Sequence, residues 1–263
     1  MRKKEFLETQ ACTECPMRFG KPAGIAIALV VVCLLWALAA QVMNKPFLPY
    51  PTAVFAGLIR LGKNGVLGRH VSASMGRLLW ALLIGFFPAA FLGLVSGRSK
   101  RLNAVISPFV YIIHPLPKSA FLPIIMLFLG LGNASKIFLL AFTIFSQVLL
   151  AARDASERVS ETCITAVRSM GANRAALFVH VILPASLPGL CTALRVCIGT
   201  VIAVLFLAET FAAETGLGYL IVDAWTRVAY TEMFAGILVM SMVGLLLFGT
   251  VDLLERLLCP WET

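Results

Sequence analysis

The chain has 263 residues, of which 60% are apolar and only 13% are charged, and its formal net charge is +9. A water-soluble domain carries about 25% charged residues, and one core cannot bury the apolar surplus that a mean hydropathy of +0.92 describes. The composition therefore excludes a soluble domain, intrinsic disorder and a fibrous repeat, and it indicates an integral membrane protein.

The basic residues lie between apolar runs and form no single stripe, so they favour a cytoplasmic excess of Lys and Arg over a nucleic-acid site. An odd number of cysteines, seven, scattered through apolar stretches argues against a disulfide framework. Cys12 and Cys15 form a CxxC pair, but no second pair follows at zinc-site spacing. We interpret it as a reduced cytoplasmic pair.

The first apolar run covers 22–43 and is long enough to cross a membrane. Basic residues precede it and no small-residue cleavage site follows, so we expect a retained span after a cytoplasmic tail, 1–21. The segment 44–77 is expected to be external and partly helical. Its basic residues fit that placement least well: Lys45, Arg60, Lys63, Arg69 and Arg77.

The second span is expected from about Leu78 to Ser96. Small residues recur there at every fourth position, an arrangement that lets membrane helices approach closely: Ala81, Gly85, Ala89, Gly93 and Gly97. A basic loop follows and favours the cytoplasmic side.

The stretch 103–130 is apolar but interrupted by prolines and by Lys118. Proline removes a backbone donor and breaks or kinks a helix, so either one broken crossing or two separate spans are possible. Because the next clean run, 134–152, leads into four arginines, an odd number of crossings is required if these are cytoplasmic. One interrupted crossing is therefore favoured, although a span with a re-entrant segment stays open.

Two further runs, 189–208 and 234–254, are joined by a mostly acidic connection that we expect outside the cell. The sequence thus predicts an all-α protein of six transmembrane helices with both termini in the cytoplasm. Its core transmembrane domain covers 78–258, and 259–263 form a cytoplasmic tail.

The segment 153–188 is patterned like a folded module. Asp154 and Glu157 suggest a helix start, an amphipathic stripe follows, and Gly171 stands where a helix commonly ends. Asn173 is placed to cap a second helix, which we expect to stop near Leu183 because Pro184 follows.

Residues in this segment resemble the EAA loop of ABC-importer permeases of the MetI-like type. The family spacing is kept throughout, with Thr165 and Val167 as departures in residue type. Of the seven positions that define the pattern, four match in type and Val181 is a conservative change; the seven are Thr165, Ala166, Val167, Gly171, Val181, Leu183 and Pro184. The stretches around 114–136, 170–196 and 208–221 look like the nitrate/sulfonate/taurine branch.

The resemblance implies a MetI-like helical bundle in the bacterial inner membrane whose cytoplasmic loop couples to an ATPase. It also implies the partners: two ATP-binding cassette subunits, a second permease copy and an extracytoplasmic solute-binding protein. The solute would be a small anion such as nitrate, a sulfonate, taurine or bicarbonate, or a related small organic molecule such as a pyrimidine.

No GxxxxGK[ST] phosphate loop and no catalytic motif is present, so we expect no enzyme activity and no cofactor in this chain. The three histidines are too dispersed to indicate a metal site. An alternative is a secondary transporter driven by an ion gradient, but such folds often contain two related halves, which are not visible here.

Ionisable residues within spans usually mark a pathway or a buried pair. Lys118 lies among prolines in the broken crossing and is the main pathway candidate. Arg195 and Glu209 are weaker candidates, because Arg195 can extend to the cytoplasmic headgroups and Glu209 can simply be exposed outside.

Overall fold

A computed structural model describes residues 21–260, and these contain helices and no strand. The described residues divide between Ala53 and Val54 into two compact units. The first unit contains α2 (Lys21–Met43) and the first residues of α3 (Pro51–Lys63). Cys12 and Cys15 lie outside the described residues, as does most of the predicted N-terminal tail.

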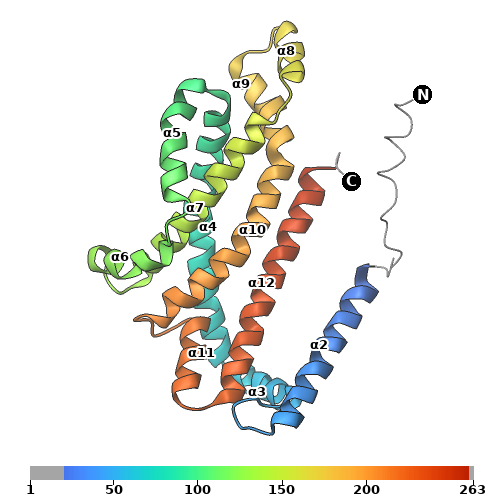
Figure 1. Cartoon of the computed structure of the whole chain (residues 1–263), viewed down its shortest axis with the longest axis vertical. Coiled ribbons are helices and arrows are strands. Elements are labelled where there is room, and N and C mark those ends of the chain that lie inside the picture. The colour runs from blue at the N-terminus through green and yellow to red at the C-terminus, as the bar shows by residue number, and fades with distance from the viewer. Residues whose placement is uncertain (1–20, 261–263) are drawn as a thin grey trace, which may run out of the picture. The chain divides into compact units, whose positions relative to one another are not determined.

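The second unit contains the remaining helices in the order of Figure 1. They are α4 (Val66–Arg98), α5 (Lys100–Ile113), the 3₁₀ turn η1 (Lys118–Phe121), α6 (Leu122–Leu129), α7 (Asn133–Glu157), α8 (Glu161–Ser169), α9 (Arg174–Leu177), the π-helical turn η2 (Phe178–Ile182), α10 (Leu183–Thr210), α11 (Leu217–Thr226) and α12 (Tyr230–Leu258).

Four helical segments are long and apolar enough to cross a membrane: α4, α7, Arg174–Thr210 and α12. The pair formed by α5 and η1–α6 passes the same test jointly, with a bend of 83° at the break. The predicted interruption near His114 is therefore present, and the pair supplies a fifth crossing if it is one span. The remaining predicted crossing, the first along the chain, corresponds to α2. The described apolar part of α2, Ile27–Met43, is shorter than the four segments named above.

The predicted stripe of small residues on α4 packs against α7. A Cβ atom on Gly85 would lie 2.6 Å from the carbonyl oxygen of Ala141, and one on Gly93 would lie 2.6 Å from the Cβ of Ala152. Ala81 and Ala89, between them on the same face, are fully buried. The stripe therefore brings the two backbones together, as the spacing indicated.

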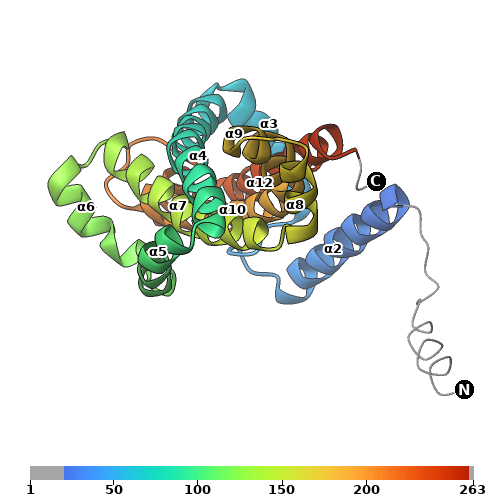
Figure 2. The same cartoon turned by 90° about the horizontal axis from the view of Figure 1, so that it is seen from above.

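The main apolar core lies where α4, α7, α10, α11 and α12 meet. Leu78, Ile144 and Leu205 are representative of it and are almost inaccessible to solvent. The view in Figure 2 shows α5 and α6 to one side of these helices, and Leu127 and Phe128 of α6 are among the most exposed apolar side chains.

Three element boundaries differ from the expectation. Helix α4 starts at Val66, so Arg77 lies inside a helix where the sequence suggested the end of an external segment. Helix α7 continues to Glu157, so Asp154 and Glu157 lie in its last turns and form no helix start. Helix α10 begins at Leu183, so the chain does not leave the helical region before Pro184.

The reason for the last difference is the π-helical turn η2. Its wider winding lets the Leu183 N–H donate to the carbonyl of Phe178, and Pro184 then stands in the first turn of α10. The first turn of a helix tolerates proline because its N–H groups have no intrahelical partner there.

Candidate functional site

Two regions of the second unit contain most of the residues considered below. One is a small helical module between α7 and α10, formed by residues 158–182. The other is a buried polar cluster at the opposite end of α7 and α10. Figure 1 shows α8 and α9 of the module beyond one end of the bundle and α11 at the other.

The module begins where Ser160 caps α8: its side chain accepts a hydrogen bond of 3.3 Å from the Thr162 N–H. Gly171 follows the helix with φ +88°, a left-handed conformation that a side chain makes costly. The Asn173 side chain then caps α9 by accepting from the Ala176 N–H at 2.8 Å. The predicted helix–glycine–helix pattern and the Asn173 cap are both present.

The module has its own small core. Val159, Ile164 and Leu177 are buried there, and Val167 and Val181 pack against them. The residues that resemble the EAA loop fall into two groups. Val167 and Val181 pack against this core, whereas Thr165 and Ala166 are exposed on α8. Leu183 and Pro184 form the junction with α10.

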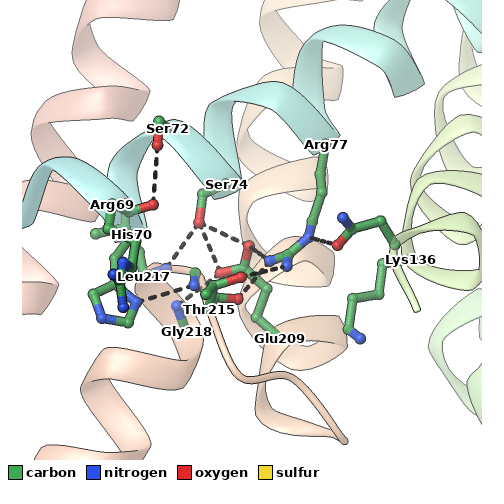
Figure 3. Close-up of polar contacts among 12 residues, drawn as sticks. Arg69, His70, Ser72, Ser74, Arg77, Lys136, Glu209, Thr215, Leu217 and Gly218 are labelled. Carbon is green, nitrogen blue, oxygen red and sulfur yellow. Dashed lines mark hydrogen bonds and ion pairs between the residues drawn. The ribbon is translucent and has the colours of Figure 1, made fainter. Parts of the chain in front are cut away.

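Glu209 is the centre of the buried polar cluster (Figure 3). It has 0% exposure, and its carboxylate accepts hydrogen bonds from Ser74 Oγ at 2.7 Å, Arg77 Nη1 at 2.6 Å and the Gly218 N–H at 2.8 Å. Burying a carboxylate is costly unless it is paired and hydrogen-bonded, and here both conditions are met. Glu209 is therefore neither exposed nor free.

Arg77 connects three parts of the chain. Its guanidinium pairs with Glu209, donates to the carbonyl of Thr215 at 2.7 Å and donates from Nε to the Asn133 side chain at 2.8 Å. Helix α4 is thereby fixed to the start of α7 and to the loop between α10 and α11. No local sequence pattern indicates this contact, because the partners are far apart along the chain.

Lys136 and His70 complete the cluster. Lys136 has 1% exposure and donates to the carbonyls of Leu131 at 2.9 Å and Ala212 at 3.1 Å. His70 accepts the Gly216 N–H at Nδ1 over 3.1 Å and stacks on Tyr219. Arg77, Lys136 and His70 each form a hydrogen bond with the α10–α11 loop, 211–216, so the cluster fixes this loop to the bundle.

The pathway candidates of the sequence do not meet at one site. Lys118 is buried at the α5–α6 break, where its Nζ donates to the His114 carbonyl at 3.0 Å. Arg195 forms ion pairs with Asp252, at 2.7 Å, and with Glu255, so its charge is satisfied by α12 and needs no headgroup. Glu209 belongs to the buried cluster described above.

A second ionic contact lies outside the spans, at the turn between α11 and α12. Arg227 pairs with Asp223 at 2.8 Å and with Glu232 at 3.1 Å, and Glu232 also pairs with Arg60 at 3.2 Å. The hydrogen bond to Asp223 raises the pKa of the Arg227 guanidinium. It joins α11 to α12 around the short turn.

A groove of about 630 Å³ lies between α7 and α10 on the side of the module. Gln147, Asp154 and Arg158 of α7 line one wall, and the other wall consists of small side chains and Thr192 of α10. A hollow of about 480 Å³ below the module shares Ala155, Arg158 and Ala185 with the groove, so the two are continuous. No group of His, Cys, Asp or Glu within residues 21–260 is placed to hold a metal ion.

Comparison with known proteins gives consistent results. Residues 81–260 match the sequence profile of the family described as "Binding-protein-dependent transport system inner membrane component". The taurine transport system permease protein TauC of Escherichia coli K12 is 32% identical, covering 90% of this chain and 89% of that protein. The putative aliphatic sulfonates transport permease protein SsuC of Bacillus subtilis 168 is 28% identical, covering 93% and 89%.

The fold resembles that of a chain in the inward-facing MetNI methionine ABC transporter. The TM-score is 0.58 at 20% sequence identity, over 73% of this chain and 97% of that one. At this identity the likeness concerns the fold alone.

Proposed function

We infer the function of this chain from its family: it belongs to the binding-protein-dependent transport system inner membrane components, whose profile covers residues 81–260. It is therefore a multi-pass inner-membrane permease of an ABC importer, and the family is not itself enzymatic. An importer of this kind works with an ATPase and a solute-binding protein.

We propose that the solute is a small organic sulfonate. Relatives similar over about nine-tenths of this chain are named for taurine and for aliphatic sulfonates, and a sulfonate is the chemical group that these solutes share. This likeness carries the proposal. A permease named for formylaminopyrimidine is also similar, at 24% identity, so pyrimidines are the comparison solutes for the test.

We further propose a complex of two permease copies and two ATPase subunits with one solute-binding protein. Both termini and the module would then lie in the cytoplasm, where the module contacts the ATPase. The exposed residues Thr165 and Ala166 would meet the ATPase directly, and Gly171, Val167, Val181, Leu183 and Pro184 would hold the module in shape and join it to α10. The module's separate core supports this division of roles.

The test is transport in proteoliposomes that contain the purified permease, its ATPase and its binding protein. We expect ATP-dependent uptake of taurine or ethanesulfonate and weak uptake of a formylaminopyrimidine. Uptake of the pyrimidine alone would overturn the proposed solute class but leave the importer assignment intact.

A further inference from the structure

Two side chains of opposite charge, Asp154 and Arg158, line the groove between α7 and α10 and do not pair with each other. Asp154 and Arg158 are four residues apart on α7, a spacing that places them on one helix face, and both line the groove. Within residues 21–260, Asp154 and Arg158 form no ion pair with each other, and the one ion pair of Asp154 is the long contact with Arg153. An anion site and a cation site therefore stand one helical turn apart.

The Asp154 carboxylate is available to a ligand. Its contact with Arg153 Nε is 3.6 Å long, and that Nε makes no hydrogen bond. Arg153 instead donates to Ser107 at 3.1 Å and lies over the ring of Tyr111. The Asp154 side chain retains 43% exposure.

The Arg158 guanidinium is available as well. Arg158 caps the end of α7 with its backbone, and its side chain takes part in none of the hydrogen bonds or ion pairs found among the described residues. It lines both the groove and the hollow below the module, so it stands where the two meet.

The rest of the groove lining consists of His114 and of small or uncharged side chains, and its size suits a small molecule. Its volume of about 630 Å³ is within the range of about 300–1,000 Å³ that is usual for small-ligand sites. Gln147 lines it with a side-chain oxygen that is buried and has no hydrogen-bond partner. Across the groove, Thr192 of α10 offers one hydroxyl.

We propose that this groove binds a zwitterionic aminosulfonate on its way through the permease. Arg158 receives the sulfonate and Asp154 the ammonium group, and Gln147 and Thr192 contact the short linker. This inference rests on the proposed function, which assigns the solute to the sulfonates, and it narrows that class to aminosulfonates. A guanidinium suits an oxyanion because its donors match two oxygens at once, and a carboxylate accepts from an ammonium.

The experiment compares uptake of taurine with uptake of ethanesulfonate, which lacks the ammonium group, by the reconstituted importer with saturating loaded binding protein. Asp154→Asn should lower the taurine-to-ethanesulfonate uptake ratio about tenfold, the loss expected for one charge-assisted hydrogen bond. Arg158→Gln should lower uptake of both solutes, and Arg158→Lys should restore part of it.

Two variants serve as matched controls. Arg153 forms an ion pair with Glu157 at 3.5 Å and one with Asp154 at 3.6 Å. Glu157→Gln and Asp154→Asn each remove one of these pairs, but Glu157 does not line the groove. Arg256→Gln removes an exposed arginine of α12. Neither should change the uptake ratio.

A cysteine at Thr192 reports whether the groove is open. In a background that lacks the native cysteines and still transports, this cysteine should react with a small charged thiol reagent in at least one nucleotide state. A cysteine that is inert in every state would mean that protein, such as a second copy, fills the groove, and the proposal would fail.

The uptake results separate the two proposals. An equal effect of Asp154→Asn and Glu157→Gln on the ratio would overturn the zwitterion site. So would a wild type that transports ethanesulfonate but not taurine, although the sulfonate class would stand. A wild type that transports neither solute would overturn the sulfonate class itself.

Discussion

Glu209 and Arg77 show how a membrane protein keeps two charges inside its helical bundle. Neither side chain contacts solvent appreciably, their atoms are 2.6 Å apart, and further bonds from Ser74 and Gly218 satisfy the carboxylate. Removing one member of such a pair leaves the other charge buried without compensation. The pair therefore fixes the α10–α11 loop more firmly than a neutral contact would.

Glu209→Gln should destabilise the detergent-solubilised protein by roughly 3–5 kcal/mol, because Arg77 loses its counter-charge. Thermal unfolding monitored by fluorescence measures the effect as a lower Tm. Glu214→Gln is the control, since Glu214 is an exposed residue of the same loop. Equal melting temperatures for the two variants would contradict the structural role of the cluster.

Gly171 has φ +88°, and a Cβ placed there would meet nothing within 4 Å. Any effect of substitution therefore comes from the backbone and not from a clash. Gly171→Val should cost roughly 1–3 kcal/mol in the module and reduce solute-stimulated ATPase activity, whereas membrane insertion persists. Gly171→Asn should be milder, since asparagine tolerates this conformation, and normal coupling by the valine variant would refute the left-handed turn.

Lys118 stays a pathway prediction. Its side chain already finds a carbonyl partner at the helix break, which reduces the cost of about 2.5–3.5 kcal/mol for a lysine at mid-bilayer. Lys118→Met should leave insertion and assembly intact and reduce uptake, more strongly for an anionic solute than for a neutral one. Normal uptake, together with a cysteine at 118 that resists water-soluble thiol reagents, would assign Lys118 to the stability of the break alone.

At the scale of elements, the apolar runs predicted the membrane helices. The stripe of small residues at every fourth position predicted the face of α4 that packs closely, which contacts α7. Periodicity also located α8, the Gly171 turn and the Asn173 cap, because these depend on neighbouring residues. The Arg77–Glu209 pair joins residues 132 positions apart, and no local pattern reveals such a contact. The apolar pattern therefore places Arg77 at the end of the external segment 44–77, where its positive charge fits least well.

The C-terminal end of α7 and the start of α10 differ from the predicted boundaries for a different reason. Asp154 and Glu157 have the spacing of a helix start, but both lie in the last turns of α7, where Arg153 of the same helix pairs with both carboxylates. Pro184 normally ends a helix, yet the π-helical turn before it removes the conflict. Both outcomes depend on packing and winding that residue types alone do not specify.

The α4–α7 contact predicts that replacing two glycines of α4 by alanine changes the stability of the protein in opposite directions. Gly93→Ala places a Cβ 2.6 Å from the Cβ of Ala152 and should lower the Tm by separating the helices. Gly76→Ala meets nothing within 4 Å and should stabilise α4 by about 0.5–1 kcal/mol, the usual gain of alanine over glycine within a helix. Similar shifts for both variants would exclude the close contact.

At the scale of the whole molecule, the module and the polar cluster occupy opposite ends of the helices that join them. Helices α7 and α10 run between the two, and the groove with Asp154 and Arg158 lies along them near the module. We propose that a movement of the module moves α7 and α10, which line the groove, while the cluster fixes their other ends to α4. We infer that ATP-driven movement of the module opens and closes this groove.

The central claim is that this chain is the membrane subunit of an ATP-driven importer, and the most direct test is uptake in proteoliposomes with the energy source controlled. With the ATPase and loaded binding protein present, uptake of the sulfonate should require ATP and should persist after ion gradients are dissipated. Uptake that survives ATP depletion while an ion gradient remains, from a chain that retains no ATPase subunit on purification, would contradict the account.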